Sequence, residues 1–416
     1  MKYGLIGKKL KHSYSKIIHE KLGYYNYDLI ELNDDELETF LKKKDFNGIN
    51  VTVPYKQKVI PYLNALSKEA IMCNSVNTIV NENGNLVGYN TDFLGFNDLL
   101  KYNNIDVYNK KIMVLGTGGS AQSISKLLNS LSVKQIIFVS SSNKKGSISY
   151  QDIDKYCYDI DILINTTPKE MFPNNEQIIV SIDNFDNLSC VIDIIYNPLN
   201  TNLLLQAKQK GIKAINGLYM LVSQALYSAE YFLNNHCTNK HTKNKIYEEL
   251  VNEKENIVLI GMPSCGKSTI GKKLAKKLNK EFYDIDNLIA NKINMNICDY
   301  INKYGEEEFR KIEHEVIKQI YKQNSLVIAT GGGTILNEKN VLLLKQNSKL
   351  FFIDRDIQNL HFDVTRPLSS TYEKLVELYN QRYDLYNKYC DYKIDGNQSI
   401  CKIINTIVRR RNKWKF

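Results

Sequence analysis

The chain has 416 residues, and 55 lysines and arginines against 45 acidic residues give it a formal net charge of +10. Its length allows two or three domains, and a composition of 43% hydrophobic and 24% charged residues excludes a disordered chain and a disulfide-rich scaffold. Apolar runs such as Leu350–Ile353 are far shorter than the ~20 residues that span a bilayer, and residues 1–10 contain no signal-peptide core. We therefore expect a cytoplasmic protein without a membrane partner.

Segments typical of strands and helices alternate twice along the chain, which predicts an α/β protein with parallel sheets covered by helices. The first series runs from 3–6 to an amphipathic stretch at 218–233, and the second begins at 257–260. Between them, the polar composition of 236–254 predicts a linker, with a helix considered only for 246–254.

The densest basic cluster is at the C-terminus and comprises Arg409, Arg410, Arg411, Lys413 and Lys415. A nucleic-acid-binding role for this tail is one interpretation. No recognition module accompanies the cluster, so a solvated helix end that complements the helix dipole is favoured. We expect no nucleic-acid partner, because small anionic ligands also account for the basic charge.

A predicted strand, a glycine-rich turn and a predicted helix follow one another at 111–128. The turn is Gly116-Thr117-Gly118-Gly119-Ser120-Ala121. In this context G-x-G-x-x-A is a dinucleotide fingerprint, because the glycines allow close approach to a pyrophosphate and the helix N-terminus favours its charge. The sequence therefore predicts a Rossmann domain whose cofactor contacts include Gly116, Gly118, Gly119, Ser120 and Ala121.

The end of the next predicted strand, 135–139, indicates which dinucleotide binds. It is followed by Ser140-Ser141-Ser142-Asn143-Lys144-Lys145, where an NAD enzyme normally carries an acidic residue for the ribose 2′-hydroxyl. Hydroxyls and lysines suit a 2′-phosphate instead, which favours NADP(H) with Ser141 and Lys144 as contacts. A solvated turn is the alternative interpretation of the two lysines.

A second phosphate-binding signal stands in the second half. The predicted strand 257–260 leads into Gly261-Met262-Pro263-Ser264-Cys265-Gly266-Lys267-Ser268-Thr269 and then a helix, which matches G-x-x-x-x-G-K-[ST]. In such a loop the backbone amides surround the phosphates of ATP, the lysine reaches the β/γ oxygens and the following hydroxyl binds Mg²⁺. The predicted nucleotide contacts are Gly261, Ser264, Cys265, Gly266, Lys267, Ser268 and Thr269.

Further motifs follow this loop in order: Asp284-Ile285-Asp286, 305–313 with Arg310, Ala329-Thr330-Gly331-Gly332-Gly333, Arg366-Pro367-Leu368 and Arg382. Together they show that the chain, from about residue 256 to the C-terminus, resembles shikimate kinase. The resemblance implies a P-loop domain similar to the nucleoside monophosphate kinases, with a parallel sheet, and an ATP-dependent phosphorylation of shikimate.

The same resemblance implies roles for particular residues. Asp286 would bind the shikimate hydroxyls and orient or deprotonate the attacking one, while Asp284 and Ser268 would hold Mg²⁺.

Three arginines complete the implied kinase site. Arg310 and Arg382 would bind the substrate carboxylate, for which a planar guanidinium is suited, and Gly332 would line the substrate pocket. Arg366 would be the catalytic cation of the lid, in contact with ATP and the transferred phosphate.

The first half carries its own ordered motifs: His12-Ser13-Tyr14-Ser15, Asn50-Val51-Thr52-Val53-Pro54-Tyr55-Lys56, Val76-Asn77-Thr78, Asn90-Thr91-Asp92 and 217–224. In that order they resemble shikimate dehydrogenase over about residues 1–235. By this resemblance Lys56 and Asp92 form the catalytic pair, in which a lysine ammonium supplies or stabilises the proton on the developing alkoxide.

The dehydrogenase resemblance also implies the substrate and cofactor contacts. Ser13 and Ser15 would bind the substrate carboxylate, and the other substrate contacts would be Thr52, Asn77, Asp92, Gln224 and Tyr196. Thr166, in a loop beside the nicotinamide, and Gly217 would contact the cofactor. Glu170 stands where the family usually has glycine.

The two resemblances converge, since the product expected from the first half is the substrate expected for the second. They predict a bifunctional enzyme that reduces 3-dehydroshikimate with NADPH and phosphorylates shikimate with ATP and Mg²⁺. A quinate-type dehydrogenase fused to another small-molecule kinase is the alternative, and the sequence leaves the oligomeric state open. The predicted boundaries are 1–102, completed by 218–235, for the substrate domain, 103–217 for the Rossmann domain, 236–254 for the linker and 255–416 for the kinase.

Overall fold

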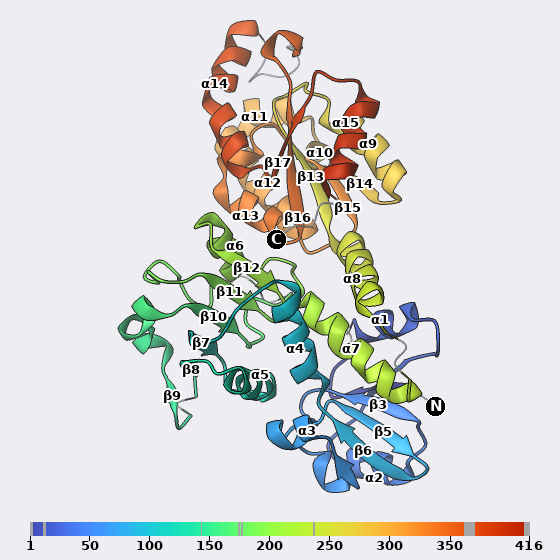
Figure 1. Cartoon of the computed structure of the whole chain (residues 1–416). Coiled ribbons are helices and arrows are strands. Elements are labelled where there is room, and N and C mark those ends of the chain that lie inside the picture. The colour runs from blue at the N-terminus through green and yellow to red at the C-terminus, as the bar shows by residue number, and fades with distance from the viewer. Residues whose placement is uncertain are drawn as a thin grey trace. The chain divides into compact units, whose positions relative to one another are not determined.

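The computed structural model describes residues 3–10, 14–142, 144–173, 175, 178–235, 238–361 and 371–411 (Figure 1). The chain divides into two compact units: the first comprises 1–171, 176–196 and 206–250, and the second comprises 172–175, 197–205 and 251–416. Both contain sheets in which parallel pairing predominates, so the predicted α/β class is confirmed. In the described part of the chain, no helix combines the length and apolarity needed to cross a membrane.

The first sheet of the first unit has the strand order β2-β1-β3-β5-β6-β4. Its strands are β1 (Tyr3–Gly7), β2 (Asp28–Glu31), β3 (Gly48–Val51), β4 (Ala65–Leu66), β5 (Thr78–Glu82) and β6 (Asn85–Tyr89). β1 pairs in parallel with β2 and β3, whereas β5 is antiparallel to β3 and β6. The intervening helices are α1 (Ser15–Lys21), α2 (Glu36–Lys43), the 3₁₀ turn η1 (Ile60–Tyr62) and α3 (Lys68–Cys73).

The second sheet of this unit is parallel throughout, in the order β12-β11-β10-β7-β8-β9. Its strands are β7 (Lys111–Leu115), β8 (Gln135–Val139), β9 (Ser147–Ile148), β10 (Ile162–Asn165), β11 (Cys190–Asp193) and β12 (Lys213–Asn216). The helical segments between them are α5 (Gly119–Ser130), η2 (Tyr150–Lys155), η3 (Cys157–Asp159) and α6 (Asn202–Gln209). In such a sheet the carboxyl ends of the strands form the edge where ligands bind.

Two long helices, α4 (Thr91–Tyr102) and α7 (Leu218–Leu233), pack side by side in the first unit (Figure 1). Gly95 of α4 permits their close approach: a Cβ at this position would lie 2.8 Å from the carbonyl oxygen of Met220 and 2.9 Å from Cβ of Gln224. The two helices are therefore in backbone contact where α4 carries Asp92 and α7 carries Gln224.

Helix α8 (Lys240–Lys254) occupies most of the segment that the sequence analysis interprets as a linker. Lys243 forms an ion pair of 2.5 Å with Asp98 of α4, and the hydroxyl of Tyr219 of α7 donates to Asn244 at 3.0 Å. The helix considered for 246–254 thus begins six residues earlier. Its polar composition is compatible with packing because Lys243 is neutralised by a carboxylate and lies 3.8 Å above the ring of Tyr227.

The sheet of the second unit is parallel, in the order β14-β15-β13-β16-β17. Its strands are β13 (Asn256–Ile260), β14 (Glu281–Asp284), β15 (Leu326–Ala329), β16 (Ser348–Asp354) and β17 (Tyr392–Asp395). Its helices are α9 (Lys267–Leu278), α10 (Ile285–Ile293), α11 (Ile297–Tyr304), α12 (Glu306–Ile320), η4 (Thr334–Leu336), α13 (Glu338–Lys345), η5 (Ile357–Asn359), α14 (Tyr372–Tyr389) and α15 (Ile400–Arg411). β13 is buried along its whole length at the centre of the sheet, which confirms the predicted parallel kinase fold.

Candidate active sites

A cavity of about 840 Å³ in the first unit collects most of the side chains predicted for the reductase. The predicted residues on its wall are Ser15, Thr52, Lys56, Asn77, Asp92, Ser120, Tyr196, Gly217 and Gln224. They come from α1, α4, α5 and α7, from the segments that follow β3 and β11, and from the residues that directly precede β5 and α7. Predicted Ser13 lies outside the described residues. A volume of this size is typical of a small-molecule site.

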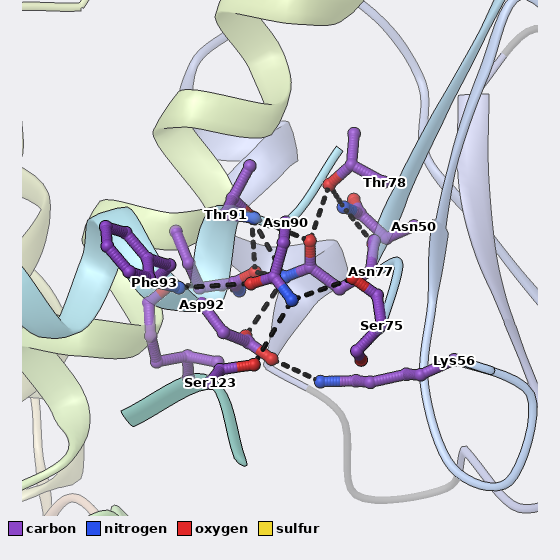
Figure 2. Close-up of polar contacts among 12 residues, drawn as sticks. Asn50, Lys56, Ser75, Asn77, Thr78, Asn90, Thr91, Asp92, Phe93 and Ser123 are labelled. Atoms are coloured by element: carbon purple, nitrogen blue, oxygen red, sulfur yellow. Dashed lines mark hydrogen bonds and ion pairs between the residues drawn. The ribbon is translucent and has the colours of Figure 1, made fainter. Parts of the chain in front are cut away.

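Lys56 and Asp92 form an ion pair on the cavity wall (Figure 2). Lys56 Nζ lies 2.5 Å from Asp92 Oδ2, and the two side chains are 17% and 10% exposed. At this depth, water screens the pair only partly, so the carboxylate fixes the direction of the ammonium group. The pair is therefore suited to deliver a proton or stabilise an oxyanion in the cavity.

The second carboxylate oxygen of Asp92 has its own partner, since Asn77 Nδ2 donates to Asp92 Oδ1 at 3.0 Å. Asp92 lies in the first turn of α4, whose N-cap is Asn90: the side-chain oxygen of Asn90 accepts the amide N–H of Phe93 at 3.1 Å. Asn90 is itself fixed because its Nδ2 donates to the carbonyl oxygen of Ser75 at 2.9 Å. Capping and side-chain bonds thus define where the Asp92 carboxylate points (Figure 2).

Tyr196 contributes a neutral hydroxyl to the cavity. Burial raises the pKa of Tyr196 to about 12, and its ring meets that of Tyr14 edge to face at 5.6 Å. At neutral pH the phenol therefore stays protonated and can donate a hydrogen bond to a ligand.

The glycine-rich turn after β7 fits a dinucleotide pyrophosphate. Gly116 adopts a positive φ of 103°, and a Cβ there would lie 2.8 Å from Thr166 Oγ1, so glycine is required for this close approach. No atom of the described chain lies within 4 Å of a Cβ placed at Gly118 or Gly119, which leaves the N-terminus of α5 open to a ligand. Buried Ala121 completes the turn.

Lys144 lies beside this turn, with its Nζ 3.4 Å from the carbonyl oxygen of Thr117. Ser141 is exposed in the same loop, next to the bonded pair Ser140 and Ser142, whose hydroxyls lie 3.0 Å apart. The residues predicted to accept a 2′-phosphate are thus on the surface near the pyrophosphate turn, where a cationic group suits a second phosphate.

In the second unit, the phosphate-binding loop joins β13 to α9 as predicted. Lys267 is buried, and its ammonium group donates to the carbonyl oxygens of Gly261 at 2.9 Å and Met262 at 2.8 Å. Ser264 and Gly266 have φ values of 62° and 95°, which turn the loop back on itself ahead of the helix. A curved loop that encloses a lysine side chain is the geometry with which phosphate-binding loops hold nucleotide phosphates.

The hydroxyl of Ser268 lies next to the predicted metal-binding carboxylate, since Ser268 Oγ donates to Asp284 Oδ2 at 2.5 Å. The other oxygen of Asp284 caps α10 by accepting the amide N–H groups of Asp286 at 3.1 Å and Asn287 at 3.4 Å. Two oxygen ligands at adjacent positions are compatible with Mg²⁺, which prefers oxygen donors and retains several waters.

Arg310 is held in place by two carboxylates of α12. Its guanidinium donates to Glu306 Oε1 at 2.8 Å and to Glu313 Oε2 at 2.9 Å, and Glu313 is fully buried. Burial opposes the charge of Arg310, but Glu313 and Glu306 outweigh this effect and raise its pKa. A Cβ at Gly333 would lie 2.1 Å from Arg310 Nη2, so the guanidinium packs directly on the glycine-rich strand end.

Arg382 lies on α14, one turn before Tyr386. It is 3% exposed, and its Nε has no hydrogen-bond partner among the described residues. Burial lowers the pKa of Arg382. The neighbouring Tyr386 donates its hydroxyl to the carbonyl oxygen of Gly332 at 2.5 Å, and Asp286 Oδ1 would lie 2.7 Å from a Cβ at Gly331. Asp286 and Arg310 thus lie against Gly331 and Gly333, and Arg382 is next along α14 to the tyrosine that contacts Gly332. Arg366 lies outside the described residues.

Comparisons with known proteins identify the families that the two parts of the chain match. The family model of the shikimate dehydrogenase substrate-binding domain matches residues 5–79, and that of shikimate kinase matches residues 263–411. The NADP(+)-dependent shikimate dehydrogenase of Clostridium perfringens strain SM101 is 38% identical over 266 residues, which are 60% of this chain and 97% of that relative. The chain belongs to the shikimate dehydrogenase family.

Solved structures agree with this family. Shikimate dehydrogenase 1 from Peptoclostridium difficile is 32% identical and matches with a TM-score of 0.56 over 60% of this chain and 98% of its own. A chorismate mutase/shikimate 5-dehydrogenase fusion from Clostridium acetobutylicum is 35% identical, with a TM-score of 0.56 over 60% and 96% of the two chains. With its kinase domain, this dehydrogenase is a fusion of an NADP-dependent oxidoreductase and a phosphotransferase.

Several residues that shape the cavity of the dehydrogenase were not predicted from the sequence. Lys8, Lys9 and Glu31 lie on the wall, as do Asn50 and Met220. Asn50 and Met220 belong to the motifs 50–56 and 217–224, so their positions near Thr52 and Gln224 were usable signals. The other three come from segments whose approach to the cavity depends on the strand order, which the sequence does not display.

Proposed function

We propose that the first unit reduces 3-dehydroshikimate to shikimate with NADPH, and that the second phosphorylates shikimate to shikimate 3-phosphate with ATP and Mg²⁺. The observation that carries the proposal is the ion pair of Lys56 and Asp92, 2.5 Å long, on the wall of a cavity large enough for the substrate. The shikimate kinase domain supports the order of the two steps, because it would consume the product of the first.

In the reductase, bound NADPH supplies the hydride. The ammonium group of Lys56 is proposed to give its proton to the alkoxide that develops on the substrate carbonyl oxygen, and the ion pair with Asp92 orients that group. Thr52, Asn77 and Gln224 are proposed to bind the ring hydroxyls from the cavity wall. Ser15, together with Ser13, is proposed to bind the carboxylate.

The proposed cofactor contacts follow from the open turn after β7. The amides at Gly118 and Gly119 would hold the pyrophosphate, and Ser141 and Lys144 would bind the 2′-phosphate that distinguishes NADP(H). Thr166 closes the turn from the opposite side, because its hydroxyl donates to the carbonyl oxygen of Leu115 at 2.7 Å.

In the kinase, bound ATP supplies the phosphoryl group, and Lys267 is proposed to bind its phosphates, with Ser268 and Asp284 holding Mg²⁺. Asp286 is proposed to orient the attacking hydroxyl. These proposed roles suit phosphoryl transfer, because that reaction depends on positioning the reactants and neutralising the charge of the phosphates.

The substrate anchors are proposed to be Arg310, which packs on Gly333, and Arg382, which is close enough to Arg310 to be affected by its charge. A shikimate carboxylate would supply the hydrogen-bond acceptor that the buried Nε of Arg382 lacks within the described chain. Arg366 is proposed to act on the transferred phosphate.

Product analysis by mass spectrometry tests both reactions. Purified protein is incubated with 3-dehydroshikimate, NADPH and Mg²⁺, with and without ATP. We expect shikimate alone without ATP and shikimate 3-phosphate with it, and we expect Lys56→Ala to yield neither from 3-dehydroshikimate. Absence of both products from folded wild-type protein would remove the substrate assignment.

A quinate-type dehydrogenase fused to another kinase is the alternative. It predicts faster NADP-dependent oxidation of quinate than of shikimate, measured as kcat/KM for each, and no phosphorylation of shikimate. Loss of shikimate phosphorylation in Asp286→Asn, in a protein that retains its reductase, would count against this alternative.

A further inference from the structure

Behind the wall of the reductase cavity, one serine of α7 connects the elements that carry the reacting pair. Ser228 is fully buried and is not part of the cavity lining in the described chain. Its hydroxyl oxygen lies 2.8 Å from Asn50 Nδ2, 2.8 Å from Thr78 Oγ1 and 3.2 Å from Thr91 Oγ1. It also donates to the carbonyl oxygen of Gln224 on its own helix at 2.9 Å. One hydroxyl therefore joins β3, β5, α4 and α7.

Thr91 is the link from Ser228 to the reacting groups, because it directly precedes Asp92 at the start of α4. The amide N–H of Thr91 donates to Asn77 Oδ1 at 2.8 Å, and the Thr91 hydroxyl lies 3.3 Å from Gln224 Oε1. Two successive turns of α7, at Gln224 and Ser228, thus hold the first turn of α4. The position of that turn determines where the Asp92 carboxylate meets Lys56.

Asn50 cannot compensate for a lost partner by rotating its amide. Tyr27 donates its hydroxyl to Asn50 Oδ1 at 2.6 Å, and burial raises the pKa of Tyr27, so this group remains a donor at neutral pH. Asn50 Nδ2 must then face the carbonyl oxygen of Asn77 at 3.1 Å and the hydroxyl of Ser228. Figure 2 shows this network leading from Asn50 and Thr78 through Asn77 and Thr91 to Asp92 and Lys56.

We propose that Ser228 is a positioning residue of the reductase, which holds Asp92 against Lys56 through Thr91 and Asn50. This inference rests on the proposed function, in which Lys56 and Asp92 act at the substrate carbonyl. Misplacement of reacting groups by about 1 Å can cost about 10²-fold in rate. Because Ser228 does not border the cavity, its loss affects the rate of the chemical step and leaves substrate binding nearly unchanged.

The first test is Ser228→Ala in the full chain. We expect kcat of the reductase to fall about tenfold, with KM for 3-dehydroshikimate and the affinity for NADPH changed by less than about twofold. The matched control is Ser125→Ala on α5, since Ser125 is also buried and bonds back to its own helix, with Oγ 2.9 Å from the carbonyl oxygen of Gln122. This control is expected to keep kcat within about twofold of the wild type.

A double-mutant cycle with Thr91→Val tests the route. Val keeps the shape of Thr and removes its hydroxyl, so if Ser228 acts through Thr91 the double variant loses about as much kcat as the larger single effect. If instead the fold-losses in kcat of the two single variants multiply in the double variant, Ser228 does not act through Thr91 and this route is overturned. Ser228→Cys, which keeps a weak donor, is expected to lie between Ser228→Ala and the wild type, and it serves as the folded variant if alanine prevents folding.

A structural role alone would lower the melting temperature and leave kcat unchanged, and that result overturns the proposal. If the wild type does not reduce 3-dehydroshikimate, the proposed function fails and the positioning role fails with it. If the wild type is active and Ser228→Ala matches its kcat, only the positioning role is overturned.

Discussion

At the scale of single residues, helix α1 carries a buried histidine that stays uncharged. His19 is fully buried, stacked on Tyr27 with ring centroids 4.1 Å apart, and its Nδ1 lies 2.7 Å from the hydroxyl of Tyr25. Burial lowers the pKa of His19 from 6.5 to about 3. The folded chain therefore leaves this imidazole neutral at pH values where the unfolded chain protonates it.

This difference makes the stability of the first unit depend on pH. Below pH 6.5 the unfolded state gains a proton that the folded state excludes, so the free energy of unfolding falls as pH falls towards 3. From pH 7 to pH 5 the loss is about 2 kcal/mol. His19→Phe preserves a stacking ring and does not titrate, so it should remove about this much of the pH dependence.

Hydrogen exchange measured by mass spectrometry tests this prediction. The protection of the amides of β1 and β3 is compared between pH 7 and pH 5, after correction for the intrinsic exchange rate at each pH. His241→Phe is a suitable control because His241 is exposed on α8. An unchanged pH dependence in His19→Phe would contradict the role of this imidazole.

Sequence motifs pointed to the proposed reacting groups more completely than to the residues that hold them in place. Lys56, Asp92 and Lys267 belong to motifs with fixed spacing, and the structure places them in the geometry that those motifs imply. Thr91 belongs to the motif Asn90-Thr91-Asp92, but the motif assigns it no role. Ser228 carries no such signal, because a buried serine in a helix has the same sequence pattern as an exposed one. Their importance depends on which strands and helices meet, and only the structure shows this.

At the scale of elements, the contact between α4 and α7 sets the distance between Asp92 and Gln224. Gly95→Ala would normally stabilise a helix by about 1 kcal/mol. Here the added Cβ would lie 2.8 Å from the carbonyl oxygen of Met220 and 3.1 Å from the amide nitrogen of Gln224, both backbone atoms that cannot rotate away. We expect a net destabilisation of about 1–3 kcal/mol and a lower reductase kcat as the helices separate.

The thermal midpoint for loss of reductase activity and the kcat of the folded variant measure these two effects. Asn97→Ala on the same helix is the comparison, because it raises helix propensity at a half-buried position. If Gly95→Ala stabilised the protein as much as Asn97→Ala, the backbone contact would not limit the helix spacing.

Elements defined by composition were predicted less well than elements defined by motifs. The segment assigned to a linker forms most of α8, because Lys243 and Asn244 find partners on α4 and α7 that its polar sequence does not reveal. Arg411 was expected in a solvated helix end, yet it is 5% exposed and lies 3.9 Å from the buried Glu255. Tertiary pairing of charges explains both differences.

Glu170 shows how the fold accommodates a departure from the family pattern. The residue has a φ of 72°, a conformation that favours glycine, which agrees with the glycine usual in the family. Its side chain is fully buried, and Glu170 Oε1 accepts the amide N–H of Ile179 at 2.8 Å. This bond offsets part of the backbone strain, so the loop keeps its path with a larger residue.

At the scale of the whole molecule, the two proposed active sites draw their residues from different units. Lys56 and Asp92 belong to the first unit, and Lys267 and Asp286 belong to the second. The boundaries proposed from the sequence, with the kinase at 255–416, separate the same residues. The groups proposed for each reaction therefore belong to one unit, and a substitution in one site should leave the chemistry of the other intact.

Lys267→Ala tests this independence. The ammonium group of Lys267 is buried among the carbonyl oxygens of Gly261 and Met262, so its loss removes the cation that would neutralise the transferred phosphate. We expect kinase activity to fall at least about a hundredfold, by analogy with the loss of one preorganised electrostatic donor. Reductase activity, followed by NADPH absorbance in the same preparation, should stay within about twofold of the wild type.

Lys273→Ala is the matched control, since Lys273 is an exposed lysine on the same helix α9 and should leave both activities unchanged. Lys56→Ala gives the reciprocal result, with the reductase lost and phosphorylation of added shikimate retained. A parallel fall of both activities in either active-site variant, with unchanged circular dichroism and melting temperature, would mean that the two catalytic cycles are coupled. The activity of each unit would then require an intact active site in the other unit, and the fusion would do more than join two independent enzymes.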